Sequence, residues 1–208
     1  MSSFLSFLNN IFLHKALKKG VYKLFFCKLE VEYLMFCANQ LRTNTLTMKN
    51  LILIRHAKSS WEAPLRDFDR PLMKNGILDA HLVSSNISNF IPKTYLIWSS
   101  PARRASDTAL IFAQNISYPI ESIVYKNELY TFDENQLEKE IKSCDNSFES
   151  VILFGHNAAI TNFVNKFGDV FIDNVPTSGF VSLQFEADSW GKITKGKTKK
   201  IIFPKDLK

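Results

Sequence analysis

The sequence contains few cysteines. Its 208 residues include three, Cys27, Cys37 and Cys144, and no CxxC motif. An odd number of cysteines without ligand spacing predicts neither a disulfide framework nor a zinc site. Such sparing use of cysteine is typical of proteins in a reducing compartment, and we expect the chain to be cytoplasmic.

The sequence also lacks an apolar run long enough for a transmembrane helix. The first 47 residues are rich in Phe and Leu, but Asn9, Asn10, His14 and four lysines between Lys15 and Lys23 interrupt them. A membrane span needs roughly 18 consecutive apolar residues. A secretory signal would carry its positive charge before the apolar residues, and here the lysines follow them. We therefore predict no membrane span.

Two explanations remain for residues 1–47. The segment could form an amphipathic surface helix, because lysines alternate in blocks with large apolar residues. Alternatively, translation begins at Met48, directly before the first predicted strand, and the upstream stretch is not part of the natural protein. We favour the second explanation. The sequence thus predicts an N-terminal extension over 1–47 outside the folded domain, and one folded domain over 48–208.

The formal charge of +6 lies at the two ends of the chain. Residues 1–47 carry 6 Lys and Arg against 2 acidic residues, and residues 192–208 carry 7 against 1, whereas residues 48–191 carry 13 against 17. A nucleic-acid interface would need a basic stripe with interleaved aromatic residues, which the central segment lacks. We therefore predict no nucleic-acid partner.

From Met48 onward, short apolar runs alternate with segments of helical period. The runs predict strands over 51–54, 95–98, 122–125 and 151–154, followed by an antiparallel pair over 180–187 and 199–204. Helices are predicted over about 72–89, 104–115, 132–144 and 158–167. In the first helix we expect a buried face of Ile77, Ala80, Ser84 and Ile87. This order predicts an α/β three-layer sandwich with a mostly parallel central sheet and no large lid insertion.

Positively charged and histidine side chains follow three of the predicted strands. Arg55 and His56 follow the first, Arg103 and Arg104 the second, and His156 the fourth. Ligands of open α/β sheets bind beyond the carboxyl ends of the strands, so we expect these side chains to share one rim. The guanidinium fork of arginine matches phosphate oxygens, and a neutral histidine can attack phosphorus.

Other phosphate chemistries lack their motifs in this sequence. No Gly-rich phosphate loop is present, and no carboxylates are spaced for two metal ions. We therefore predict no metal and no cofactor, with the arginines supplying the charge that stabilises the transition state.

The motifs RHAKSSW, DFDRPLMKNG, SSPARRASDTA, ELY, FGHNAAI and VPTSGFVSLQF occur in this order between Met48 and Leu207. They resemble the histidine phosphatase superfamily, which has the phosphoglycerate mutase-like fold, and in particular its compact SixA-like phosphohistidine phosphatase branch. The resemblance implies that His56 is the nucleophile and that Arg55 and Arg104 grip the phosphoryl oxygens. It further implies that His156 stabilises the transferring group, while Arg103 faces outward.

Further residues of these motifs are weaker candidates. Glu128 in ELY stands where larger members of the family have a proton donor, and Ser100 and Asn157 are candidate substrate contacts. Asp67 and Asp69 are expected to form the loop and cap ahead of the next helix, because Asp favours such positions.

The sequence therefore predicts a hydrolase, a metal-independent phosphatase that works through phospho-His56, with a phosphohistidine-bearing protein as its substrate and partner. Two alternatives stay open: a phosphatase of a small phosphorylated metabolite, and a non-catalytic module that binds phosphate or phosphoproteins. The intact nucleophile at His56 favours an enzyme. Mutase activity is disfavoured, because nothing resembles a lid that would retain the substrate between transfers.

Overall fold

The computed structural model describes residues 47–208. The predicted extension over 1–47 lies, apart from Thr47, outside the described residues. No helix within 47–208 is both long enough and apolar enough to cross a membrane.

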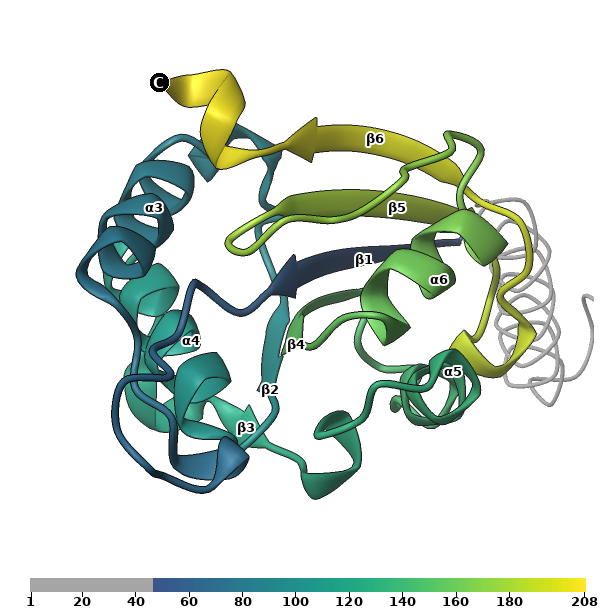
Figure 1. The fold of residues 1–208 in the computed structure, drawn as a ribbon. Coiled ribbons are helices and arrows are strands. Elements are labelled where there is room, and N and C mark those ends of the chain that lie inside the picture. The colour runs from purple at the N-terminus through teal and green to yellow at the C-terminus, as the bar shows by residue number, and fades with distance from the viewer. Residues whose placement is uncertain (1–46) are drawn as a thin grey trace, which may run out of the picture. The chain divides into compact units, whose positions relative to one another are not determined.

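A six-stranded sheet with the order β3-β2-β4-β1-β5-β6 forms the centre of the domain (Figure 1). The first four of these strands are parallel to one another, whereas β5 is antiparallel to both β1 and β6. The strands are β1 (Met48–Arg55), β2 (Leu96–Ser99), β3 (Val124–Tyr125), β4 (Ser150–Gly155), β5 (Phe180–Glu186) and β6 (Lys197–Ile202). The prediction of a mostly parallel α/β sheet that closes with an antiparallel pair is confirmed.

Two pairs of helices cover the sheet (Figure 1). The helices are α3 (Lys74–Ser85), α4 (Arg103–Asn115), α5 (Glu134–Lys142) and α6 (Ala159–Phe167). Helices α3 and α4 pack on one face of the sheet, and α5 and α6 pack on the other. Alternate residues of β1 enter these two cores, Leu51 and Leu53 beside α6 and Ile52 and Ile54 beside α4. The apolar run of β1 is continuous because both faces of this strand are buried.

One predicted helix face is partly wrong. Ala80, Ser84 and Ile87 are buried as expected, but Ile77 is 39% exposed. The helix turns Gly76 inward instead, where a Cβ atom would clash with the backbone of Lys58. This close approach sets the rotation of α3 and leaves Ile77 off the buried face.

Candidate active site

The two histidines of the site follow neighbouring parallel strands. Arg55 at the end of β1 pairs in register with Gly155 at the end of β4, and the N–H of His56 donates to the carbonyl of Gly155 at 3.0 Å. His56 and His156 are therefore brought to the same edge of the sheet, with their ring centroids 5.1 Å apart. The strand register thus places both predicted histidines at one rim.

The ring of His56 is held in one tautomer. Its Nδ1 lies 2.8 Å from the carbonyl oxygen of Ala57, and because a carbonyl only accepts, Nδ1 carries the hydrogen. Burial lowers the pKa of His56 to about 4, helped by the charges of Arg104 and Arg55 and opposed by the Ala57 hydrogen bond. Nε2 is therefore unprotonated at neutral pH, and its lone pair accepts a hydrogen bond from the Nε–H of Arg104 at 3.2 Å.

His156 is held from behind by a buried serine. Its Nε2 lies 2.8 Å from the hydroxyl oxygen of Ser100, and this oxygen accepts a hydrogen bond from the N–H of Ala102 at 3.3 Å. Burial lowers the pKa of His156 to about 2. Its Nδ1 is buried and has no hydrogen-bond partner within the described residues. Ser100 thus orients His156 and is not one of the residues that line the cavity.

The adjacent arginines Arg103 and Arg104 point in different directions. Arg104 is 2% exposed, and its guanidinium donates to the carbonyl and the carboxylate of Asp67. The side chain of Arg103 is 57% exposed and pairs with Asp107 at 3.7 Å. Arg55 donates from Nη1 to the carbonyl of Val175 at 2.8 Å, whereas its buried Nε has no partner within the described residues.

Asp67 was expected to cap the next helix, and the structure gives it a different role. It lies in the short 3-10 helix Asp67–Asp69, does not cap α3, and instead accepts hydrogen bonds from Arg104, Arg70 and Tyr130 at 2.9, 2.9 and 2.7 Å. Partial burial raises its pKa, but the hydrogen bonds of Tyr130 and Arg70 and the charge of Arg104 outweigh this and lower it to about 2. Asp67 is therefore an ionised carboxylate that fixes Arg104. Asp69 pairs with Arg66.

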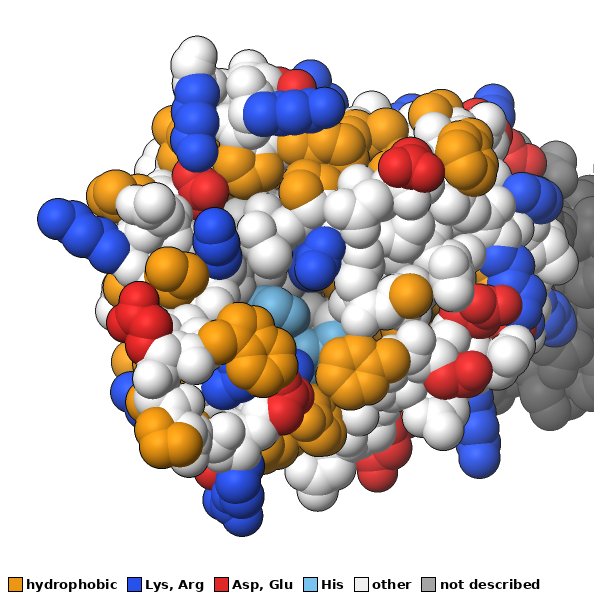
Figure 2. Space-filling model, in the orientation of Figure 1, with side chains coloured by type: hydrophobic (Ala, Val, Ile, Leu, Met, Phe, Trp, Pro, Cys, Tyr) orange, Lys and Arg blue, Asp and Glu red, His pale blue; other side chains and the backbone are white. Residues whose placement is uncertain are grey.

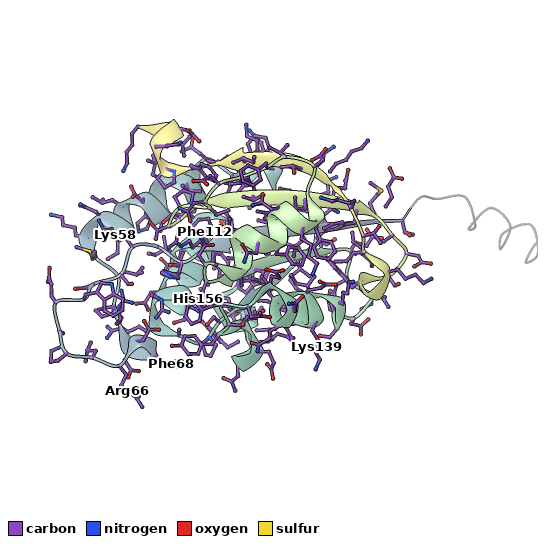
Figure 3. All side chains as sticks on the ribbon, turned by 45° about the vertical axis from the view of Figure 1, so that its right-hand side comes forward. Lys58, Arg66, Phe68, Phe112, Lys139 and His156 are labelled. Atoms are coloured by element: carbon purple, nitrogen blue, oxygen red, sulfur yellow. The ribbon has the colours of Figure 1, made fainter. Side chains whose placement is uncertain are left out.

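An open cavity of about 690 Å³ lies over these groups. Figure 2 shows histidine side chains at the floor of a hollow, with apolar and basic side chains around it. Figure 3 places His156 in the interior of the domain, whereas Arg66 lies at its outer edge. The lining residues include Arg55, His56, Lys58, Trp61, Glu62, Asp67, Arg70, Arg104, Phe132 and Asn157.

Not every predicted residue reaches this cavity. Asn157 lines it, while its side-chain oxygen also accepts from the N–H of Thr161 in the first turn of α6. Glu128 lies in the 3-10 helix Asn127–Leu129, is exposed, and does not line the cavity. Sequence reasoning missed Arg70, Trp61 and Phe132, which do line it.

The two buried histidines predict a pH-dependent stability. Their pKa values lie below the 6.5 of an unfolded chain, so between about pH 6.5 and 4 the unfolded chain binds more protons than the folded domain. The free energy of unfolding should therefore decrease as the pH is lowered through this window. The decrease from pH 7 to pH 5 should be about 2 kcal/mol per histidine. Urea unfolding at both pH values measures this. His156→Asn should lose about half of the histidine contribution, and an unchanged pH dependence in that variant would contradict a buried, neutral His156.

Comparison with known proteins agrees with this geometry. A family model for the histidine phosphatase superfamily (branch 1) matches residues 51–129. The crystal structure of the putative phosphohistidine phosphatase SixA from Agrobacterium tumefaciens is 26% identical, with a TM-score of 0.61 over 74% of this chain and 97% of that one. Over residues 51–129 the chain is thus similar to the histidine phosphatase superfamily.

Two further comparisons concern the fold and a short stretch of sequence. The structure of the protein histidine phosphatase SixA in complex with tungstate has a TM-score of 0.65 at 20% identity, covering 76% of this chain and 99% of that chain. An uncharacterised chloroplastic protein of Arabidopsis thaliana is 46% identical over 66 residues, which are 31% of this chain and 30% of that protein. The likeness to the tungstate complex shows a shared fold.

Proposed function

We propose that this protein is a metal-independent phosphatase that transfers a phosphoryl group to His56, and that its substrate is phosphohistidine on a protein. The observation that carries the proposal is the state of His56. Its Nε2 has a lone pair at neutral pH and lies 3.2 Å from a guanidinium nitrogen of the buried Arg104. A nucleophile and the cation that would hold its target are thus side by side.

The reaction proceeds in two steps. The substrate reacts with the second nitrogen of its phosphohistidine ring protonated. The Nε2 lone pair of His56 attacks phosphorus, the bond from phosphorus to the substrate nitrogen breaks, and the ring leaves as neutral imidazole. Water then attacks the phosphorus of phospho-His56, which releases inorganic phosphate and a proton and restores the neutral imidazole of His56. The guanidinium groups of Arg55 and Arg104 stabilise the charge on the phosphoryl oxygens in both steps. The Nδ1 of His156, which has no partner within the described residues, is the third group that contacts these oxygens, with its hydrogen donated to them.

The acidic residues around the cavity favour a good leaving group. Asp67 is ionised and bound to Arg104, so it is a poor proton donor. Glu62 lies exposed at the mouth, and Glu128, whose role as proton donor stays a prediction, lies outside the cavity. An alkoxide needs an acid to leave, whereas a ring protonated on its second nitrogen leaves as neutral imidazole, whose conjugate acid has a pKa of about 6.5, with little help. This difference supports phosphohistidine over alkyl phosphates.

The proposal predicts an order of substrates. In the presence of EDTA, a protein bearing phosphohistidine should turn over fastest, an aryl phosphate more slowly and an alkyl phosphate more slowly still, with kcat/KM falling at least about tenfold per step. Phosphate release measures turnover, and mass spectrometry of acid-free digests should locate the transient phosphoryl group on His56.

Other results would redirect the proposal. Faster turnover of an alkyl metabolite than of phosphohistidine would indicate a small-molecule phosphatase. Phosphate binding without turnover of any substrate would indicate a binding module and would contradict the enzymatic proposal. Loss of all activity with EDTA, regained on addition of a divalent cation, would contradict the metal-independent mechanism.

A further inference from the structure

Two aromatic side chains at the mouth of the cavity are unusually exposed. Trp61 is 75% exposed and Phe132 is 51% exposed, yet both line the same cavity as His56. They belong to separate loops, which follow β1 and precede α5 respectively. The faces of these rings offer apolar surface and no positive charge to an anion, so they indicate contact with another part of the ligand.

Trp61 is a fixed platform with one free face. The guanidinium carbon of Arg70 lies 3.1 Å from the centroid of its ring, which is a stacked contact. Arg70 cannot swing away, because it donates to the carbonyl of Ser60, the hydroxyl of Ser59 and the carboxylate of Asp67 at 2.9, 2.8 and 2.9 Å. Since the ring is 75% exposed despite this contact, its other face is open.

Phe132 packs against two aromatic side chains of the site, His156 and Tyr130. Its ring centroid lies 5.4 Å from that of His156 and 5.8 Å from that of Tyr130. Tyr130 in turn donates to Asp67 at 2.7 Å, the carboxylate that also holds Arg70. The two exposed rings are therefore tied to one network, through Arg70 on one side and Tyr130 on the other. A ligand that enters between the loops meets aromatic surfaces already in place.

We propose that Trp61 and Phe132 bind the ring of the leaving group, the imidazole of a phosphohistidine, while the phosphoryl group lies on His56. This inference rests on the proposed function and adds a determinant of specificity to it. A flat ring gains stacking and edge contacts with two aromatic side chains, whereas the chain of a phosphorylated serine or sugar does not. Trp61 and Phe132 thus select substrates whose leaving group contains a flat ring.

The experiment compares two small donors with the same bond to phosphorus. Phosphoimidazole and phosphoramidate both contain a phosphorus–nitrogen bond, but only the first has a ring. In Trp61→Ala and Phe132→Ala, the ratio of kcat/KM for phosphoimidazole to that for phosphoramidate should fall about tenfold relative to the wild type. Trp61→Phe keeps an aromatic platform and should keep most of the ratio.

Phe90→Ala is the matched control, because Phe90 is an exposed aromatic residue in a different hollow, beside Lys199 and Lys200. Its ratio should equal that of the wild type. If Trp61→Ala and Phe132→Ala slow both donors equally, or slow neither, the ring-binding role is wrong although the phosphatase proposal stands. If the wild type turns over neither donor nor any other phosphohistidine substrate, the proposed function itself fails. Circular dichroism of each variant separates these outcomes from misfolding.

Discussion

His56→Asn should abolish turnover, with kcat at least about 10⁴-fold below that of the wild type. The loss is expected because the attacking lone pair on Nε2 has no substitute: His156, the other histidine of the site, is 1% exposed, and its Nε2 faces the hydroxyl of Ser100. The measurement is phosphate release from an aryl phosphate and from a phosphohistidine protein. Excess enzyme makes a decrease in turnover of about 10⁴-fold detectable.

Asparagine is a suitable replacement because its amide can still donate to the carbonyl that holds Nδ1 of His56 in the wild type. The arginines remain in place, so calorimetric binding of inorganic phosphate should stay within a few-fold of the wild type. Binding without turnover in this variant separates the nucleophile from the phosphate-binding groups. Turnover within about tenfold of the wild type would exclude His56 as the nucleophile.

Much of the fold was predictable because the spacing of apolar residues within each strand or helix reflects which of its faces are buried. A run such as 51–54 is apolar at every position because helices cover both faces of β1, and the faces of α4 and α6 repeat at helical spacing. Ile77 shows the limit of this reasoning. The rotation of α3 depends on the fit of Gly76 against Lys58, a contact between two elements that spacing within one helix cannot reveal.

The candidate site was predictable in part for the same reason. Arg55, His56 and His156 could be placed because strand ends are visible in the sequence, and the register of β1 with β4 then brings them together. Ser100 also follows a strand, but its hydroxyl contacts Nε2 of His156. Nothing in the sequence indicates that this side chain points to the histidine and not into the cavity.

The role of Asp67 depends on more distant contacts. Asp67 and Arg70 are three residues apart in the sequence, whereas Tyr130 is 63 residues from Asp67 and joins them only in the folded chain. The same holds for the contact of Phe132 with His156. These contacts hold the side chains of the candidate site in a fixed geometry, and only the structure shows them.

The adjacent pair Arg103 and Arg104 offers the sharpest internal test of the site. We expect Arg104→Ala to lower kcat/KM about 10³-fold, because it removes a buried donor aimed at the transferring group. Arg103→Ala should change kcat/KM by less than about twofold, since the side chain is exposed and its partner is Asp107 on the helix surface. Both variants lose one positive charge from the same turn of α4, so general electrostatic attraction of the substrate falls equally in the two.

A second readout distinguishes a catalytic Arg104 from a structural one. Its positive charge is among the causes that lower the pKa of His56. In Arg104→Ala this pKa should therefore rise from about 4, and the acid limb of the kcat/KM profile should move to higher pH. A structural defect would lower activity at every pH without moving the limb. Equal effects of the two alanine substitutions would show that Arg104 has no special role beside His56. They would remove the main support for His56 as a nucleophile with a phosphoryl-binding arginine next to it.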